Sequence, residues 1–60
     1  GYRIRFEVVE DGQRVFDYFP ETFEKGIKSI KRAKRLAEKF TNKTDYQNIC
    51  VTNNLHQPIS

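Results

Sequence analysis

The chain has 60 residues, of which 37% are hydrophobic and 32% are charged, and its formal net charge is +3. A chain this short buries only about 60% of its unfolded surface, which limits residues 1–60 to a single domain with a small core. No hydrophobic run approaches the about 18 residues of a membrane-spanning helix and no signal-peptide pattern is visible, so we expect an intracellular protein, cytoplasmic or nucleoid-associated, that binds no membrane.

The first expected elements are two strands that form a hairpin. Hydrophobic and polar side chains alternate over residues 2–10, Asp11-Gly12 predicts a tight turn, and residues 13–19 form the return strand. A two-residue turn places Asp17 opposite Phe6 on the hydrophobic face, whereas a three-residue loop places Phe16 there. A one-residue slip exchanges the two faces of a strand, and the three-residue loop keeps Asp17 off the hydrophobic face. We therefore favour the three-residue loop.

A helix is expected over residues 22–41, with Thr22 as its N-cap; an earlier start marked by Asp17 or Pro20 is the alternative. Gly26 falls on its hydrophobic face, where a close approach to the sheet explains a glycine. Ile30→Asp is expected to unfold the protein, because it buries an unpaired charge. The hydrophobic residues at helical spacing cover about half of the circumference; they are Phe23, Ile27, Ile30, Ala33, Leu36, Ala37 and Phe40.

The third strand is expected over residues 46–52, with Gln47, Ile49 and Val51 toward the core, and residues 53–60 are expected to form a tail. The order strand, strand, helix, strand predicts an α+β fold, a ββαβ two-layer sandwich. Its antiparallel sheet has the strand order 2-1-3, and the helix covers one face after a right-handed crossover. The other face stays open to water or a partner, and an exposed strand edge allows a dimer.

The sequence offers little chemistry for catalysis, and we expect no enzymatic activity, no cofactor and no metal. A Cys/His pair needs a base within hydrogen-bond reach and a pocket that excludes water, which 60 residues hardly provide. The single cysteine, Cys50, cannot form an intrachain disulfide, and with His56 it is too little for a structural zinc site. We interpret Cys50 as a small apolar strand residue and His56 as a solvated tail residue.

The most informative feature is the basic stretch KGIKSIKRAKRLAEKF. Residues 23–43 carry a net charge of +6 and the rest of the chain carries −3. Spacings of three and four residues align five of these cations along one side of the expected helix, opposite its hydrophobic face. A merely solvated helix face is the alternative, but such faces usually mix charges, because like charges at i and i+4 cost about 0.2–0.5 kcal/mol. We therefore predict that an anionic partner binds the five aligned cations and the lysine beside them, Lys31. The five are Lys25, Lys28, Arg32, Arg35 and Lys39.

Nucleic acid, contacted through its phosphate backbone, is the partner that we expect first. The alternative is an acidic protein surface, as for a phage- or mobile-element-type inhibitor or adaptor that docks on a larger protein. The open sheet face is a secondary candidate, because a sheet can enter the DNA major groove; its cations are Arg3, Arg5 and Arg14. Base stacking on the sheet is not expected, because the favoured register buries the aromatic rings.

The hairpin and the following FPETFEKGIKSIKRAKRLAEKF resemble, over residues 2–40, the arm-binding N-terminal domains of phage-type integrases. Those domains have a short sheet, a phrase near F-x-T and then an amphipathic helix, and the resemblance implies DNA binding. They complete three strands before the helix, whereas the third strand is expected after the helix here, and the sheet face carries Glu7 and Asp17.

Overall fold

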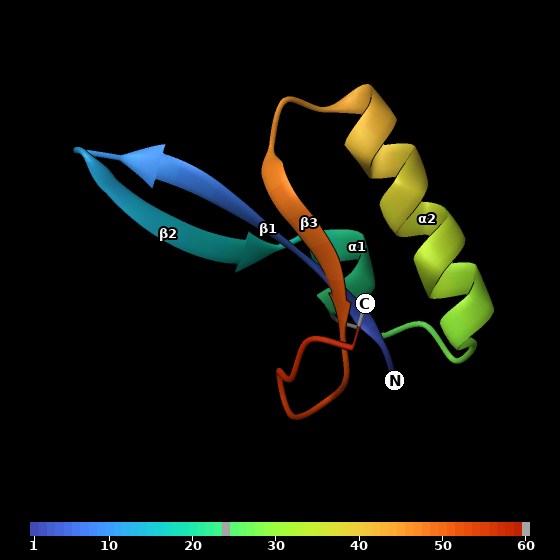
Figure 1. Cartoon of the computed structure of the whole chain (residues 1–60). Helices are drawn as coiled ribbons and strands as arrows, with labels where there is room; N and C mark the ends of the chain where they lie inside the picture. The colour runs from blue at the N-terminus through green and yellow to red at the C-terminus, as the bar shows by residue number, and fades with distance from the viewer. Residues whose placement is uncertain (24, 60) are drawn as a thin grey trace.

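The computed structural model describes residues 1–23 and 25–59, without the side chains of Glu21 and Phe23, so the expected core position of Phe23 lies outside the described residues. Three antiparallel strands form one sheet in the order β2-β1-β3, and α2 packs on one face of it (Figure 1). The predicted ββαβ arrangement of the α+β class is confirmed. The elements in chain order are β1 (Arg3–Glu10), β2 (Gln13–Tyr18), α1 (Pro20–Phe23), α2 (Ile30–Lys43) and β3 (Gln47–Thr52).

The hairpin between β1 and β2 closes with a two-residue turn, and the three-residue loop that we favoured is wrong. Asp11 and Gly12 both have positive φ, at 51° and 76°, as a type I′ turn requires. This turn matches the right-handed twist of the flanking strands. In the resulting register Asp17 lies opposite Phe6, on the face that was expected to be wholly hydrophobic.

Asp17 tolerates this position because the hairpin extends beyond the helix that covers the sheet. The tip projects away from α2, which packs on β3 and on the adjoining part of β1 (Figure 1). Asp17 therefore stays exposed although it lies on the helix face. Phe16, which was expected in the core, lies on the other face and is 62% exposed. Phe19, directly after β2, is buried in the core.

The predicted helix over residues 22–41 is broken, so its expected first third is wrong. Thr22 is not an N-cap but lies inside the single turn of α1, and its carbonyl accepts the N–H of Gly26 at 3.1 Å. Gly26 has a φ of 70°, and a Cβ there would lie 3.2 Å from Gly1 Cα. Glycine is needed at this position because the left-handed conformation ends α1 and the chain passes close to the N-terminal segment.

After Gly26 the chain briefly rejoins the sheet before α2 begins. Ile27 and Tyr2 exchange two backbone hydrogen bonds, of 2.8 and 2.7 Å, as an antiparallel bridge. Ser29 is the N-cap of α2, and its hydroxyl accepts the N–H of Arg32 at 3.3 Å. Residues 25–29 are thus a connection anchored on the N-terminal strand rather than a part of the helix.

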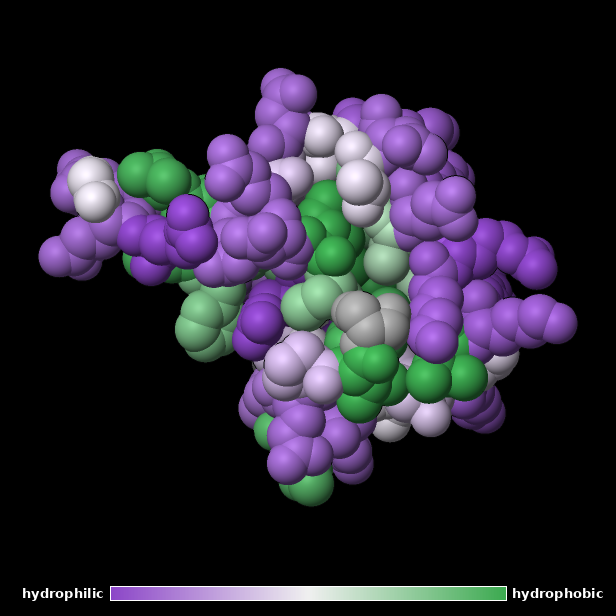
Figure 2. All heavy atoms as spheres, in the orientation of Figure 1, coloured by the Kyte–Doolittle hydropathy of each residue, from purple (hydrophilic) through white to green (hydrophobic). Residues whose placement is uncertain are grey.

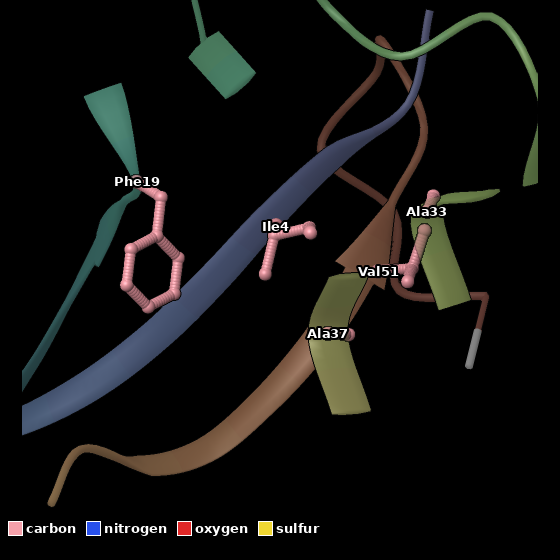
Figure 3. Packing of buried hydrophobic residues seen from close by; sticks show 5 residues of the cluster. All are labelled: Ile4, Phe19, Ala33, Ala37 and Val51. Atoms are coloured by element: carbon pink, nitrogen blue, oxygen red, sulfur yellow. The ribbon is translucent and has the colours of Figure 1, made fainter. Parts of the chain in front are cut away.

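The hydrophobic core is small and lies between α2 and the sheet. Ile4 and Val51 pack against Ala33 and Ala37 of α2, and Phe19 completes the buried cluster (Figure 3). Ile30 is 39% exposed, so the expectation that Ile30 lies in the core is wrong. The partly buried residues that surround the cluster are Tyr2, Phe6, Ile27, Leu36, Phe40 and Ile49.

The third strand contains a β-bulge. Asn48 has a φ of 50°, and the pairing of β3 with β1 shifts between Arg5 and Glu7. Ile49 and Val51 face the core as predicted, whereas Gln47, beyond the bulge, is exposed.

Residues 53–59, expected as a tail with Asn53-Asn54 as a turn or the start of disorder, form a turn that begins at Asn53 and return to β3. The side-chain carbonyl of Asn53 accepts the N–H groups of Leu55 and Gln57 at 2.9 and 3.0 Å, and Ile59 N–H donates to Val51 at 2.9 Å. This C-terminal segment covers one end of the sheet face that α2 leaves open.

Candidate nucleic-acid interface

The six cations predicted to bind an anionic partner are all exposed, but they do not lie on one continuous helix. Two of them belong to the connection over residues 25–29 and four to α2. The surface over α2 is largely hydrophilic (Figure 2). We call the exposed cations of the connection and of α2, except Lys34, the basic surface: Lys25, Lys28, Lys31, Arg32, Arg35, Lys39 and Lys43.

Three members of the basic surface converge on one hollow. Lys25 and Lys28 line it from the connection, and Arg32 lines it from the first turn of α2. Leu36 lies in the same hollow, so this side of α2 faces the connection and does not point directly away from the sheet. The break in the helix therefore brings Lys28 beside Arg32 by a turn of the chain, not by helical spacing.

Three further members lie along the second half of α2. Arg35, Lys39 and Lys43 line a shallow hollow with Glu38 and Asn42. Lys43 was not among the predicted site residues, because the helix was expected to end near Thr41. The spacing of four residues from Lys39 was the signal that could have included it.

The basic surface carries charge that the described part of the chain does not neutralise. The one ion pair among the described residues joins Arg14 Nε to Glu7 Oε1 at 4.0 Å and involves no member of the basic surface. The first turn of α2 has no acidic residue and carries Lys31 and Arg32, where the helix dipole disfavours cations. An anionic partner would offset both of these unfavourable interactions.

The three arginines proposed as secondary candidates are held by other groups of the protein. The Arg5 guanidinium lies 5.1 Å from the centroid of the Phe16 ring, and Arg3 Nη1 donates to the carbonyl of Asn54 at 3.5 Å. Arg14 pairs with Glu7. These residues lie on the hairpin and on the sheet face opposite α2, so they do not join the basic surface.

The two side chains considered for catalysis, Cys50 and His56, each lie next to another residue of the sheet. Cys50 is half-buried in β3, where it lies opposite Arg5. His56 is exposed, as expected, and its Nδ1 also lies 2.7 Å from the hydroxyl of Tyr18. Within residues 1–23 and 25–59, no three His, Cys, Asp or Glu side chains gather as metal ligands would.

No protein-family model, no curated protein and no solved structure matches this chain. No helix in the described part of the chain combines the length and hydrophobicity needed to cross a bilayer. The fold and the basic surface are therefore the features from which a function can be inferred.

Proposed function

We propose that this protein binds nucleic acid, with the basic surface contacting the phosphate backbone. The concentration of exposed cations on α2 and on the connection before it, which form no ion pair with a described acidic side chain, carries the proposal. Arg32, Lys39 and Lys43 follow one another at seven and four residues, about 10 and 6 Å along the helix axis. A nucleic-acid strand offers a comparable line of closely spaced negative charges.

The same arrangement favours contacts to phosphate over reading of the base sequence. Lysine acts as a point charge and arginine binds phosphate through its planar fork, and such contacts position a protein without specifying a sequence. We expect similar affinities for unrelated sequences and a steep loss of affinity with salt.

The test is fluorescence anisotropy with a labelled random-sequence DNA duplex and a single-stranded RNA over a series of salt concentrations. Replacing Arg32 and Arg35 by Gln should flatten the slope of log affinity against log salt by about 1.8 for the duplex, about 0.9 for each lost contact. Lys39→Gln should weaken binding, whereas Lys34→Gln is the matched control. Lys34 is an exposed lysine about 140° from Lys39 around the same helix, at about 100° per residue.

Two results would overturn the proposal. Absence of binding to either nucleic acid at low salt would do so directly. Equal losses from Lys39→Gln and Lys34→Gln would show that net charge matters and the basic surface does not. If the Arg32 and Arg35 variant instead keeps nucleic-acid affinity but loses an acidic protein partner in a pull-down, the surface serves as a protein-docking face.

A further inference from the structure

We propose that two copies of this chain associate through β2, which pairs antiparallel with β2 of the second copy and joins the two sheets into one of six strands. This inference does not depend on nucleic-acid binding. The two outer edges of the sheet differ in whether another segment of the chain pairs with them.

The outer edge of β3 is covered at its C-terminal end, whereas the outer edge of β2 is not covered by the described chain. Near the C-terminal end of β3, Ile59 N–H donates to Val51, and Pro58 forms a bridge with Thr52. No segment of the described chain pairs with the outer side of β2. An edge strand without proline, lysine or a cover is a site for pairing with another strand.

The hairpin register identifies the backbone groups that remain free on this edge. The two-residue turn makes Glu10 and Gln13 a hydrogen-bonded pair, so alternate residues of β2 direct their N–H and C=O groups toward β1. Arg14 and Phe16 direct theirs outward. Tyr18 also faces outward, but the Oδ1 of Asp17 accepts its N–H at 2.8 Å.

One symmetric register uses these free groups and leaves the Tyr18 N–H with Asp17. With Val15 on the two-fold axis, Arg14 lies opposite Phe16 of the second copy, and each of the two pairs forms two backbone hydrogen bonds. Arg14 then reaches the Phe16 ring of the second copy, as Arg5 already does within the chain. A register centred on Phe16 would place Val15 opposite Asp17 and would require the Tyr18 N–H.

The composition of the hairpin fits a second copy. Phe16 is 62% and Val9 is 65% exposed, and hydrophobic atoms are visible on the projecting hairpin (Figure 2). β2 carries one cation, Arg14, and one anion, Asp17, so two copies of it do not repel one another. The excess of positive charge lies in residues 23–43, and α2 lies away from the projecting hairpin tip (Figure 1).

The size of the contact predicts a weak dimer. A standard stable interface buries about 800 Å² on each partner, which is about one sixth of the 4654 Å² surface of this chain. A strand of six residues offers less than that, so we expect association that increases with protein concentration over the measurable range.

The first test is the mass of the protein without nucleic acid, measured by light scattering or sedimentation over a concentration series. We expect the mass to rise toward that of a dimer. Arg14→Pro should abolish the rise, because it removes an outward N–H and leaves the ladder to β1 intact. Phe16→Lys should also abolish it, whereas the control Leu55→Lys should not, since Leu55 is a 69% exposed hydrophobic residue on the C-terminal segment.

The second test is cross-linking, which remains informative if a β2 variant is destabilised. In a Cys50→Ser background, Val15→Cys should form an intermolecular disulfide on oxidation, because Cα atoms of such a non-hydrogen-bonded pair lie about 4.5 Å apart. Phe16→Cys in the same background is the register control and should cross-link poorly. Efficient cross-linking through Phe16→Cys alone would overturn the Val15-centred register.

A monomer mass at every concentration would overturn dimerisation through β2, as would a dimer that Arg14→Pro and Phe16→Lys leave unchanged. Neither result bears on the salt titration of nucleic-acid binding, so the two proposals fail separately.

Discussion

The hydroxyl of Thr22 replaces a backbone partner of Ile4 in the sheet. It accepts the buried N–H of Ile4 at 3.3 Å and donates to the carbonyl of Phe19 at 2.8 Å. Phe19 N–H donates to the carbonyl of Ile4 at 3.0 Å, so Phe19 continues the pairing of β2 with β1. The hydroxyl thus replaces the backbone pairing where the chain turns away from β1 to form α1. The pairing resumes where Ile27 lies opposite Tyr2.

Thr22→Val should therefore lower the free energy of unfolding by about 1–3 kcal/mol, the cost of a buried N–H left without an acceptor. Thr41→Val is the control, because Thr41 is exposed and its hydroxyl donates to the carbonyl of Ala37 and satisfies no buried donor. Urea denaturation measures both. Equal effects of the two variants would contradict a structural role for the Thr22 hydroxyl.

Gly26→Ala should destabilise the protein more than Gly12→Ala. Both glycines have positive φ, of 70° and 76°, so both variants incur the left-handed cost of about 1–2 kcal/mol. Only at Gly26 does the added Cβ meet backbone, with Gly1 Cα at 3.2 Å, whereas nothing lies within 4 Å at Gly12. Comparison of the two melting curves isolates the close contact, and a larger loss at Gly12 would show that the connection is not anchored as described.

Ile30→Asp should leave the protein folded, which reverses the expectation drawn from helical spacing. Ile30 is 39% exposed and is the first residue of α2, where the helix dipole favours a carboxylate. Ala33→Asp should unfold the protein, because Ala33 is fully buried and the charge would have no partner. Circular dichroism separates these outcomes; an unfolded Ile30→Asp variant would place Ile30 back in the core.

Tyr18→Phe should loosen the C-terminal segment without unfolding the sheet. It removes the 2.7 Å hydrogen bond to His56 Nδ1 and keeps the ring contact, whose centroids lie 5.3 Å apart. A double-mutant cycle with His56→Ala should give a coupling energy of about 1 kcal/mol, and the Ile59 amide should exchange faster with solvent. A coupling energy near zero would mean that the hydrogen bond between Tyr18 and His56 does not help to hold the segment.

Much of the fold follows from local patterns in the sequence. Alternation over β1, the Asp11-Gly12 turn and a single long amphipathic stretch lead to the 2-1-3 sheet with one covering helix. Burial of Ile49 and Val51 also followed from alternation. The exposed cations of α2 were predictable because their spacing separates them from the hydrophobic residues of the same stretch.

The helix break depended on helix-ending and helix-capping residues, whose signal was hidden by the continuous helical spacing of the hydrophobic residues. Gly26 and Ser29 are the residues expected at the end of one helix and the start of the next, yet the hydrophobic spacing continues through both. The tertiary structure decides between these signals, because the bridge of Ile27 with Tyr2 satisfies backbone groups in the sheet. That bridge also brings Lys25 and Lys28 together with Arg32.

The sequence by itself determined the three strands and the helix over most of α2, since these depend on local spacing and turn residues, but it did not determine the break before α2. It did not determine the hairpin register, because the three-residue loop is favoured only if one face of the whole hairpin is buried. A helix of 14 residues covers only part of the sheet, so Asp17 can lie opposite Phe6 and remain in water. Only the tertiary structure sets the extent of that cover, and with it the exposure of Phe16 and the free edge of β2.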